Sequence, residues 1–440
     1  MPPDSRWLLS ARQAKGSGDT TCSCRGPVSS ALCLTDPVIS TTGVGGPGAA
    51  QSGAGELLQM MLDGVPRTRA ELVQLTGLAR STVGARVDAL LSAGLLAPFG
   101  EAASTGGRPP ARLAFNPGAG VVVGADVGAT HALVALTDLS GGVLSERKLA
   151  IDVADGPGPV LDAVAAAARA LMDAEGRDRS ELAGVGIGLP GPVEHSTGRP
   201  ILPPIMPGWD TYDVPGHLQG QLGGPVLVDN DVNLMALGEH ATIYPAVEHL
   251  LYIKVATGIG AGIVSGGRLH RGAQGAAGDL GHVAAPNGGD APCSCGNRGC
   301  LEAVASGPAV LRTLAASGIA APDLLALVDL AKQGDLEVAA TVREAGREIG
   351  RVLATCVSLL NPSVIVVGGV MSTAAEHLLA GIREIVYGRS LPLATGGLQI
   401  VASRTGGHAG VIGAATMVTQ YVLSADQVEG RLAVGSATAV

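Results

Sequence analysis

Aromatic side chains are scarce in this 440-residue chain, at two phenylalanines, two tryptophans and five tyrosines, or 2% of the sequence. The scarcity excludes a hydrophobic core built around large rings. Hydrophobic residues still make up 46% of the chain, so the core must consist of Val, Leu, Ile and Ala. A chain of this length can form two or three domains.

Long apolar runs are also missing, because no uninterrupted stretch is long enough to span a bilayer. The most apolar stretch, residues 250–264, contains Lys254 and several glycines, which is typical of a pair of strands. A convincing signal peptide is missing too, since the apolar core of residues 7–9 is too short. We therefore expect a cytoplasmic protein that does not bind membranes.

The chain has no surplus of positive charge. Its formal net charge of −9 argues against a protein that coats nucleic acid along its whole surface, although a small basic module remains compatible with it. Seven cysteines form an odd count, which favours a reducing compartment over a disulfide framework.

Residues 1–52 are rich in Gly, Ser, Thr and Pro and lack a periodic apolar pattern, so they are expected to form a disordered tail. Cys22, Cys24 and Cys33 lie in this segment. They could form a metal site, but no histidine or further ligand lies nearby, and stray thiols are the preferred interpretation.

Four potential metal ligands follow one another in a loop rich in glycine and proline: His282, Cys293, Cys295 and Cys300. One imidazole and three thiolates make a closed tetrahedral set, which predicts a structural zinc ion. The alternatives are cysteines placed there by chance and a disulfide. Cys293 and Cys295 are too close in sequence to bridge each other comfortably, and nothing indicates an oxidising compartment.

Two carboxylates flank these ligands. Asp279 lies three residues before His282, and Glu302 lies two residues after Cys300. A loop held by zinc could turn Asp279, His282 and Glu302 toward one pocket, where polar acceptors suit the hydroxyl groups of a sugar.

These motifs resemble the signature of the ROK family, which comprises repressors, open reading frames and sugar kinases. The resemblance rests on Gly278–His282, on Cys293–Glu302 and on the glycine pattern Thr257–Gly262, and it extends over roughly residues 55–420. One departure is Asp279, which stands where the family usually has glutamate.

The resemblance implies an α/β fold, namely a two-lobed actin-like or ribonuclease-H-like ATPase fold at residues 120–425. It also implies an N-terminal winged helix-turn-helix domain at residues 55–115. Strands alternating with helices in two blocks independently indicate two α/β lobes around a cleft. Residues 426–440 are expected to form a tail.

The pattern of residues 55–115 predicts a helix-turn-helix. Thr68 and Glu71 form a capping box at the start of one helix, Gly77 turns the chain, and a second helix runs from about Arg80 to Ala93. The side chains expected to contact DNA on its exposed front half are Arg80, Ser81, Thr82 and Arg86.

A wing of two short strands should follow, with Arg108 in its glycine-rich loop entering a minor groove. The alternative is a module that contacts protein. Residues 55–115 contain six arginines, no lysine and five acidic residues, so the electrostatic signal for DNA is weak.

The family's nucleotide site implies further residues. Asp126, Gly128 and Thr130 match the first phosphate loop, an Asp-x-Gly-x-Thr turn that exposes backbone N–H groups. The second loop and the adenosine edge correspond to Thr257, Gly258, Gly260, Gly368 and Gly369. His131 replaces the lysine that usually follows this threonine in the kinases, which removes a fixed positive charge near a phosphate.

The sugar site of the family implies Asn230 and Asp231, where a strand runs into a helix N-terminus. In the kinases the aspartate at the position of Asp231 is the general base, and Asn230 would bind a hydroxyl group. A helix N-cap would explain Asp231 without chemistry. Ile205 stands where the kinases usually have a sugar-binding asparagine.

The main hypothesis is a sugar-responsive transcription regulator, a repressor of carbohydrate metabolism genes that binds operator DNA as a homodimer or dimer of dimers. Its sugar effector would lie between Asn230, Asp231, Asp279, His282 and Glu302. The alternative is an ATP-dependent kinase of a hexose or N-acetylhexosamine, with ATP and Mg²⁺ as cofactors and Asp231 as its catalytic base. Substitutions at His131, Ile205 and Asp279 count against the kinase.

Overall fold

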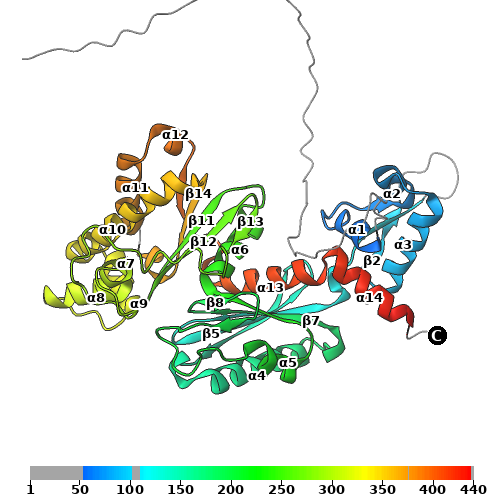
Figure 1. Cartoon of the computed structure of the whole chain (residues 1–440), viewed down its shortest axis with the longest axis horizontal. Coiled ribbons are helices and arrows are strands. Elements are labelled where there is room, and N and C mark those ends of the chain that lie inside the picture. Colours follow the sequence, from blue (N-terminus) through cyan, green and yellow to red (C-terminus); the bar gives the residue numbers. More distant parts are fainter. Residues whose placement is uncertain (1–52, 102–109, 375, 438–440) are drawn as a thin grey trace, which may run out of the picture. The chain divides into compact units, whose positions relative to one another are not determined.

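A computed structural model of the chain describes residues 53–101, 110–374 and 376–437 (Figure 1). The expected N-terminal tail, with Cys22, Cys24 and Cys33, lies outside these residues, and so does the loop that contains Arg108.

The N-terminal part, residues 53–115, is called the head below. Its helices are α1 (Ala54–Gln59), α2 (Arg69–Thr76) and α3 (Arg80–Ser92), and its strands β1 (Arg67–Thr68), β2 (Leu96–Glu101) and β3 (Ala111–Phe115) form a sheet in the order β1-β3-β2. The predicted capping box is present, because Thr68 accepts from the backbone N–H of Glu71 and the Glu71 carboxylate accepts from that of Thr68. Gly77 ends α2 with a φ of 69°. The helix-turn-helix and the strand pair of the wing are confirmed as structure.

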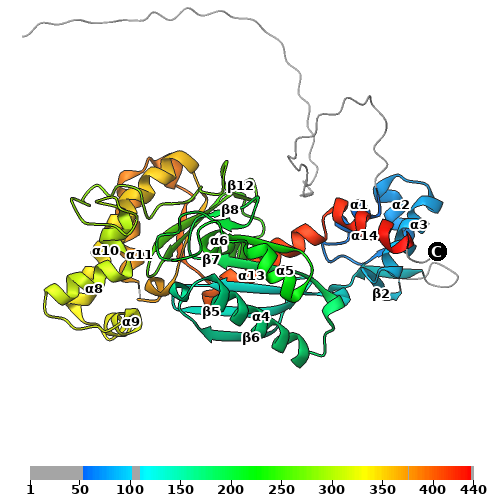
Figure 2. The same ribbon diagram turned by 60° about the horizontal axis from the view of Figure 1, so that its bottom comes forward.

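The first lobe contains a five-stranded sheet in the order β10-β7-β4-β5-β6. Its strands are β4 (Val121–Val127), β5 (His131–Asp138), β6 (Val143–Ala150), β7 (Leu182–Leu189) and β10 (Val226–Asn230). Helices α4 (Pro157–Ala174) and α5 (Val214–Leu222) cover one face, and α13 (Ala409–Val422) covers the other (Figure 2). Strands β4, β7 and β10 are parallel, so their carboxyl ends lie at one edge of the sheet.

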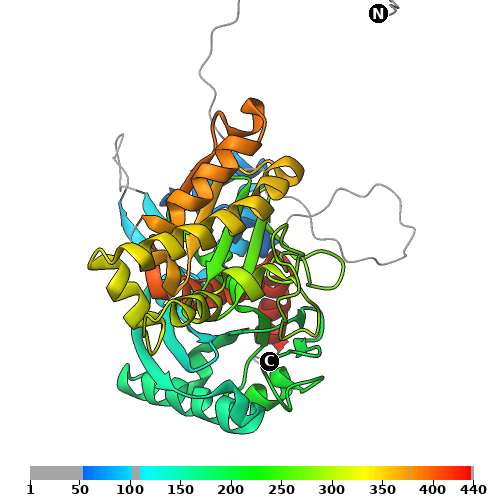
Figure 3. The same cartoon turned by 90° about the vertical axis from the view of Figure 1, so that its left-hand side faces the viewer.

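The second lobe contains another five-stranded sheet, in the order β13-β12-β11-β14-β15. Its strands are β11 (Leu250–Val255), β12 (Ile259–Ser265), β13 (Arg268–His270), β14 (Val364–Gly368) and β15 (Gln399–Ala402). The helices that accompany it are α7 (Leu301–Ala305), α8 (Gly307–Ala316), α9 (Leu324–Lys332), α10 (Leu336–Leu360) and α11 (His377–Arg389). The long yellow and orange helices in Figure 3 are α10 and α11, which pack against each other.

The remaining elements are short. They are the strands β8 (Val193–Glu194) and β9 (Arg199–Pro200), the helix α12 (Pro392–Thr395), and the 3-10 turns Pro117–Ala119, Val153–Asp155, Arg179–Glu181, Val370–Thr373 and Gly406–His408.

Strand β11 shows how the second sheet is covered on both faces. Leu251, Ile253 and Val255 pack into the cluster that contains α10, whereas Leu250 and Tyr252 pack against helix α6 (Asp231–Ile243). Helix α6 in turn packs against α13. The cores consist of aliphatic residues, as expected from the composition, and Trp209 is buried with its indole N–H donating to Val153 O at 3.0 Å.

The prediction of a tail after residue 425 is wrong, because residues Ala425–Ala437 form helix α14. Val428 is fully buried in the same hydrophobic cluster as Leu57 and Leu58 of α1. The backbone N–H of Gly55 donates to Glu429 at 3.0 Å. Two glycines lower the helical propensity of this segment, and its contacts with the head stabilise it as a helix.

Among the helices that the structure describes, none has the length and apolarity needed to cross a membrane.

Candidate functional site

A cleft of about 520 Å³ is lined by loops from both five-stranded sheets. Its size lies within the range of small-molecule sites. The sequence-predicted residues that line it are Thr130, Asn230, Asp231, Thr257, Gly258, Gly260, Asp279, His282 and Glu302. Four other predicted residues, Asp126, Gly128, Gly368 and Gly369, are not among its lining residues. The structure therefore brings the predicted sugar residues together and only part of the predicted nucleotide set.

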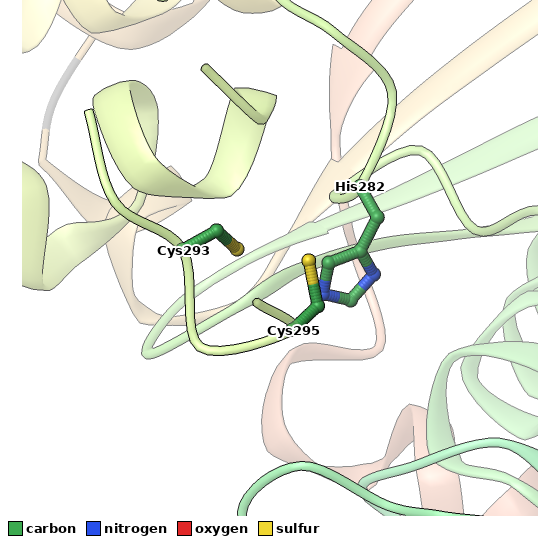
Figure 4. A group of neighbouring side chains, drawn as sticks. All are labelled: His282, Cys293 and Cys295. Atoms are coloured by element: carbon green, nitrogen blue, oxygen red, sulfur yellow. The ribbon is translucent and has the colours of Figure 1, made fainter. Parts of the chain in front are cut away.

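The loop of residues 278–302, called the cysteine loop below, gathers the predicted metal ligands. One ligand atom each from His282, Cys293 and Cys295 lies within 4.8 Å of the others (Figure 4). The Nε2 atom of His282 is buried and has no hydrogen-bond partner among the described residues. A buried imidazole nitrogen left over beside two thiols fits a metal ion.

Cys300 is the fourth predicted ligand. Its thiol is buried, and its Sγ atom lies 3.8 Å from that of Cys295. The cysteines of this loop are free thiols, which removes the disulfide alternative in this structure. Cys300 is not part of the group of three residues whose ligand atoms all lie within 4.8 Å of one another, although it contacts one member of that group. An imidazole and thiols have the chemistry of a structural zinc site.

Asp279 orients the histidine of the predicted metal site. Its Oδ1 atom lies 2.7 Å from His282 Nδ1, so the carboxylate orients the ring and leaves Nε2 toward the thiols. Metal-binding histidines commonly donate their second ring N–H to a carboxylate in this way. One of the two Asp279 oxygens is thus engaged, and the half-exposed side chain also lines the cleft.

Glu302 joins the cysteine loop to the second glycine turn. Its Oε2 atom accepts from the backbone N–H of Ile259 at 3.1 Å, and its Oε1 atom lies 3.4 Å from Ser294 Oγ. A Cβ atom on Gly258 would come within 2.6 Å of Glu302 Oε2. A larger residue at position 258 would therefore displace the Glu302 carboxylate from its contact with Ile259.

Asn230, not Asp231, is the N-cap of α6. Its Oδ1 atom accepts from the backbone N–H groups of Val232 at 3.0 Å and Asn233 at 3.4 Å, and its amide donates to Gly191 O at 3.0 Å. Asp231 is the first helical residue, so capping does not account for it. The Asp231 carboxylate remains available for chemistry or binding.

A buried ion pair occupies the floor of the cleft. The ammonium group of Lys254 on β11 pairs with Asp231 Oδ2, and the exposed fractions of the two side chains are 17% and 3%. Burial raises the pKa of nearby Asp126 to about 7; the charge of Lys254 opposes this rise, and the charge of Asp231 adds to it. Burial alone would lower the pKa of Lys254, but the two carboxylates outweigh it and raise that pKa above its usual value.

Sequence reasoning missed a supporting network behind Asp231. Asp229 is buried; its carboxylate accepts from Arg271 Nε at 2.6 Å and from the Asn233 amide at 2.8 Å. Asn233 lines the cleft, and its Oδ1 atom is buried with no partner within the described part of the chain. The sequence signal for this network was the high density of polar residues in 229–233. Only the fold shows which of them caps the helix, which supports another side chain and which lines the cleft.

Three residues differ from those usual in the family's kinases, and they lie in different parts of the structure. Ile205 lines the cleft and is exposed, so an apolar group stands where an amide was expected. His131 begins β5, and its ring lies beside Gly128 outside the cleft lining. Asp279 orients His282 as described above.

The proposed recognition helix is α3. Arg80 and Ser81 are exposed at its N-terminus, and Thr82 and Arg86 are half-buried on the same first two turns. Val83, Val87 and Leu90 of the same helix are fully buried, so the four predicted residues lie outside its buried face, and their contact with DNA stays a prediction.

The sequence model of the ROK family matches residues 122–421. The chain belongs to the ROK family. The xylose repressor of Bacillus spizizenii is 29% identical over 83% of this chain and 94% of its own length. The glucokinase of Halalkalibacterium halodurans is 31% identical over 68% of this chain and 94% of its own length.

Among solved structures, a ROK family transcriptional regulator, a homolog of the E. coli MLC protein, matches with a TM-score of 0.73 at 26% identity. The match covers 86% of this chain and 98% of that regulator. A ROK family glucokinase from Streptomyces griseus in complex with glucose and AMPPNP matches with a TM-score of 0.59 at 31% identity, over 68% of this chain. The ROK resemblance and the two-lobed α/β fold with an N-terminal winged helix-turn-helix domain are thus confirmed.

Proposed function

We propose that this ROK protein is a cytoplasmic repressor that binds operator DNA through its head and releases it when a sugar binds in the cleft. The observation that carries the proposal is the presence of both parts in one chain, a helix-turn-helix head and a polar cleft. The similarity to regulators over more than four fifths of the chain supports it. The similarity to glucokinases extends over 68% of the chain.

The cleft has the chemistry of a sugar site. Asp231, Asp279 and Glu302 present carboxylate oxygens, which are acceptors for hydroxyl groups. We propose zinc at His282, Cys293, Cys295 and Cys300 as the ion that fixes the cysteine loop, and therefore the positions of Asp279 and Glu302. Such a zinc ion is structural and supplies no chemistry of its own to the ligand.

Helix α13 lies between the head and Asp126, a buried carboxyl group whose pKa responds to the charges of the cleft residues Lys254 and Asp231. At its N-terminus, Gly410 leaves room for the Asp126 carboxylate, which a Cβ atom would overlap. At its other end, Val418 and Val422 pack in the hydrophobic cluster of the head, beside Leu57. A sugar that favours one arrangement of the lobes would bias the head through this helix, in proportion to its differential affinity for the two states.

Binding to the DNA upstream of its own gene tests this proposal, with and without D-xylose or D-glucose. We expect Arg80→Ala to lower operator affinity by about 1–3 kcal/mol, through a lost base or phosphate contact. The control is Arg312→Ala, which changes an exposed arginine in α8 of the second lobe and should bind DNA as the wild type does. Fluorescence anisotropy over a salt series measures both.

A head that binds DNA as a symmetric dimer should require an inverted repeat with half-sites about one helical turn, or a multiple of it, apart. Arg86→Ala belongs in the same series, and Arg108→Ala tests the predicted minor-groove contact of the wing. If Arg80→Ala and Arg86→Ala bind like the wild type and salt has little effect, the head contacts protein instead of DNA.

A sugar kinase remains the second candidate, because glucokinases match the cleft-forming part of the chain and Asp231 lies at its floor. We expect no turnover above background with ATP, Mg²⁺ and a panel of hexoses and N-acetylhexosamines. The reasons are the apolar Ile205, the missing lysine at His131 and the ion pair that holds Asp231. Turnover that Asp231→Asn abolishes would establish the kinase instead.

A further inference from the structure

Lysine is rare in this chain, occurring as Lys15, Lys148, Lys254 and Lys332. Among the lysines that the structure describes, Lys254 is the one that lines the cleft. By the alternation of β11 it shares a face with Leu250 and Tyr252, the face that packs against α6. Its partners in register on the neighbouring strands are Gly260 and Gly368, so no side chain flanks its stem there. The ammonium group is thereby directed to the N-terminus of α6, where Asp231 lies.

The fixed charges that line the cleft are unequal. Among its described lining residues, four carboxylates face one lysine and no arginine; the charged residues are Asp152, Asp231, Asp279, Glu302 and Lys254. Ionised carboxylates only accept hydrogen bonds, whereas an ammonium group only donates and has three N–H bonds. Asp231 takes one of the three. Lys254 is therefore the charged donor of a site that otherwise consists mainly of acceptors.

We propose that Lys254 binds the sugar directly, with Nζ donating to one hydroxyl oxygen while Asp231 accepts from the neighbouring hydroxyl. The Lys254–Asp231 pair would then recognise a vicinal diol of an unphosphorylated sugar. This assignment rests on the sugar-binding function proposed above, and it supplies the donor that Ile205 does not.

The same charges exclude a sugar phosphate. A phosphate dianion needs charge-assisted donors, and the single ammonium group is already neutralised by Asp231. The surrounding carboxylates add repulsion in a site partly shielded from water. The Lys254–Asp231 pair therefore favours a neutral sugar over its phosphate.

Calorimetric titration with D-xylose, D-glucose and D-glucose 6-phosphate tests the assignment. We expect the wild type to bind a neutral sugar and not the phosphate. Lys254→Met, which keeps the length of the side chain and removes the donor, should weaken sugar binding about 10- to 100-fold, the range for a hydrogen bond to a charged group. Lys332→Met, the same substitution on the exposed end of α9, should bind as the wild type does.

Monodeoxy analogues of the bound sugar separate direct contact from a merely structural role. The analogue that lacks the contacted hydroxyl should bind the wild type weakly, yet bind Lys254→Met no more weakly than the parent sugar does. A purely structural lysine would weaken every analogue by the same factor.

A second measurement does not depend on any variant. Lysine labelled with ¹³C at Cε gives few signals in this chain, and the Lys254 signal should shift when the sugar binds while the Lys332 signal stays. Sugar binding with an unshifted Lys254 signal, or a Lys254→Met affinity within twofold of the wild type, overturns the assignment and leaves the proposed function standing. Failure of the wild type to bind any neutral sugar overturns both.

Discussion

Cys295→Ser should lose the metal completely, from one zinc per chain to none, and should lose the sugar response with it. The Cys295 Sγ atom lies 3.8 Å from that of Cys300, and the ligand atoms of Cys295, His282 and Cys293 lie within 4.8 Å of one another. A serine hydroxyl is a poor replacement for a thiolate at a zinc ion. Because the binding free energy of a structural zinc is also folding free energy, the cysteine loop should lose its fixed conformation.

Loss of the zinc ion should weaken sugar binding because the metal fixes the positions of two carboxylates. Asp279 is held by His282, and Glu302 lies two residues after Cys300, in the first turn of α7. Without the metal neither carboxylate is fixed, so sugar affinity should fall at least about 10-fold, the equivalent of roughly one charge-assisted hydrogen bond. Elemental analysis of the purified protein and calorimetric titration with the sugar measure the two effects.

Cys356→Ser is the matched control. Cys356 is also a buried free thiol, but it lies in the last two turns of α10, outside the cysteine loop. This variant should keep one zinc per chain and its sugar affinity. A metal-free wild-type protein with full sugar binding would show that zinc does not organise the site.

Asp231→Asn should abolish sugar-induced release while leaving DNA binding in place. The change removes the acceptor at the floor of the cleft and leaves the Lys254 ammonium without its counter-charge. Loss of one partner from a buried pair costs about 3–5 kcal/mol, and loss of a charged hydrogen bond to the ligand weakens binding about 10- to 100-fold. Chemical unfolding and sugar titration measure the two quantities on the same preparation.

Asp173→Asn, the same substitution on the exposed side of α4, controls for the change itself and should alter neither quantity. Wild-type sugar affinity in Asp231→Asn would mean that the sugar lies elsewhere. A variant that binds DNA and no longer responds to sugar would separate the two activities within one chain.

The sequence predicted the fold well where local signals were strong. The capping box at Thr68 and Glu71, the turn at Gly77 and the apolar strand that begins at Val121 all identified elements that the structure contains. Helix α14 was missed because the two glycines in its sequence lower its helical propensity. Its burial depends on α1, nearly the whole chain away, and no local pattern encodes such a contact.

The sequence predicted the part of the site whose residues are close together in the chain, because a short spacing limits how far apart their side chains can lie. His282 and the cysteines lie within one loop, so sequence proximity already placed them together. Lys254 stands out in the sequence only as a charge within an apolar stretch. Its pairing with Asp231 depends on how two sheets and α6 are assembled, and the buried network of Asp229 and Arg271 depends on the same assembly.

The most direct test of a sugar-responsive repressor measures the coupling between sugar binding and DNA binding in both directions. Sugar affinity is titrated for the free protein and for the protein bound to its operator, and operator affinity is measured with and without the sugar. Linkage requires that the sugar weaken DNA binding by the same factor by which DNA weakens sugar binding, and we expect a factor of about 5–150. Equal sugar affinity in the free and DNA-bound protein would contradict the account.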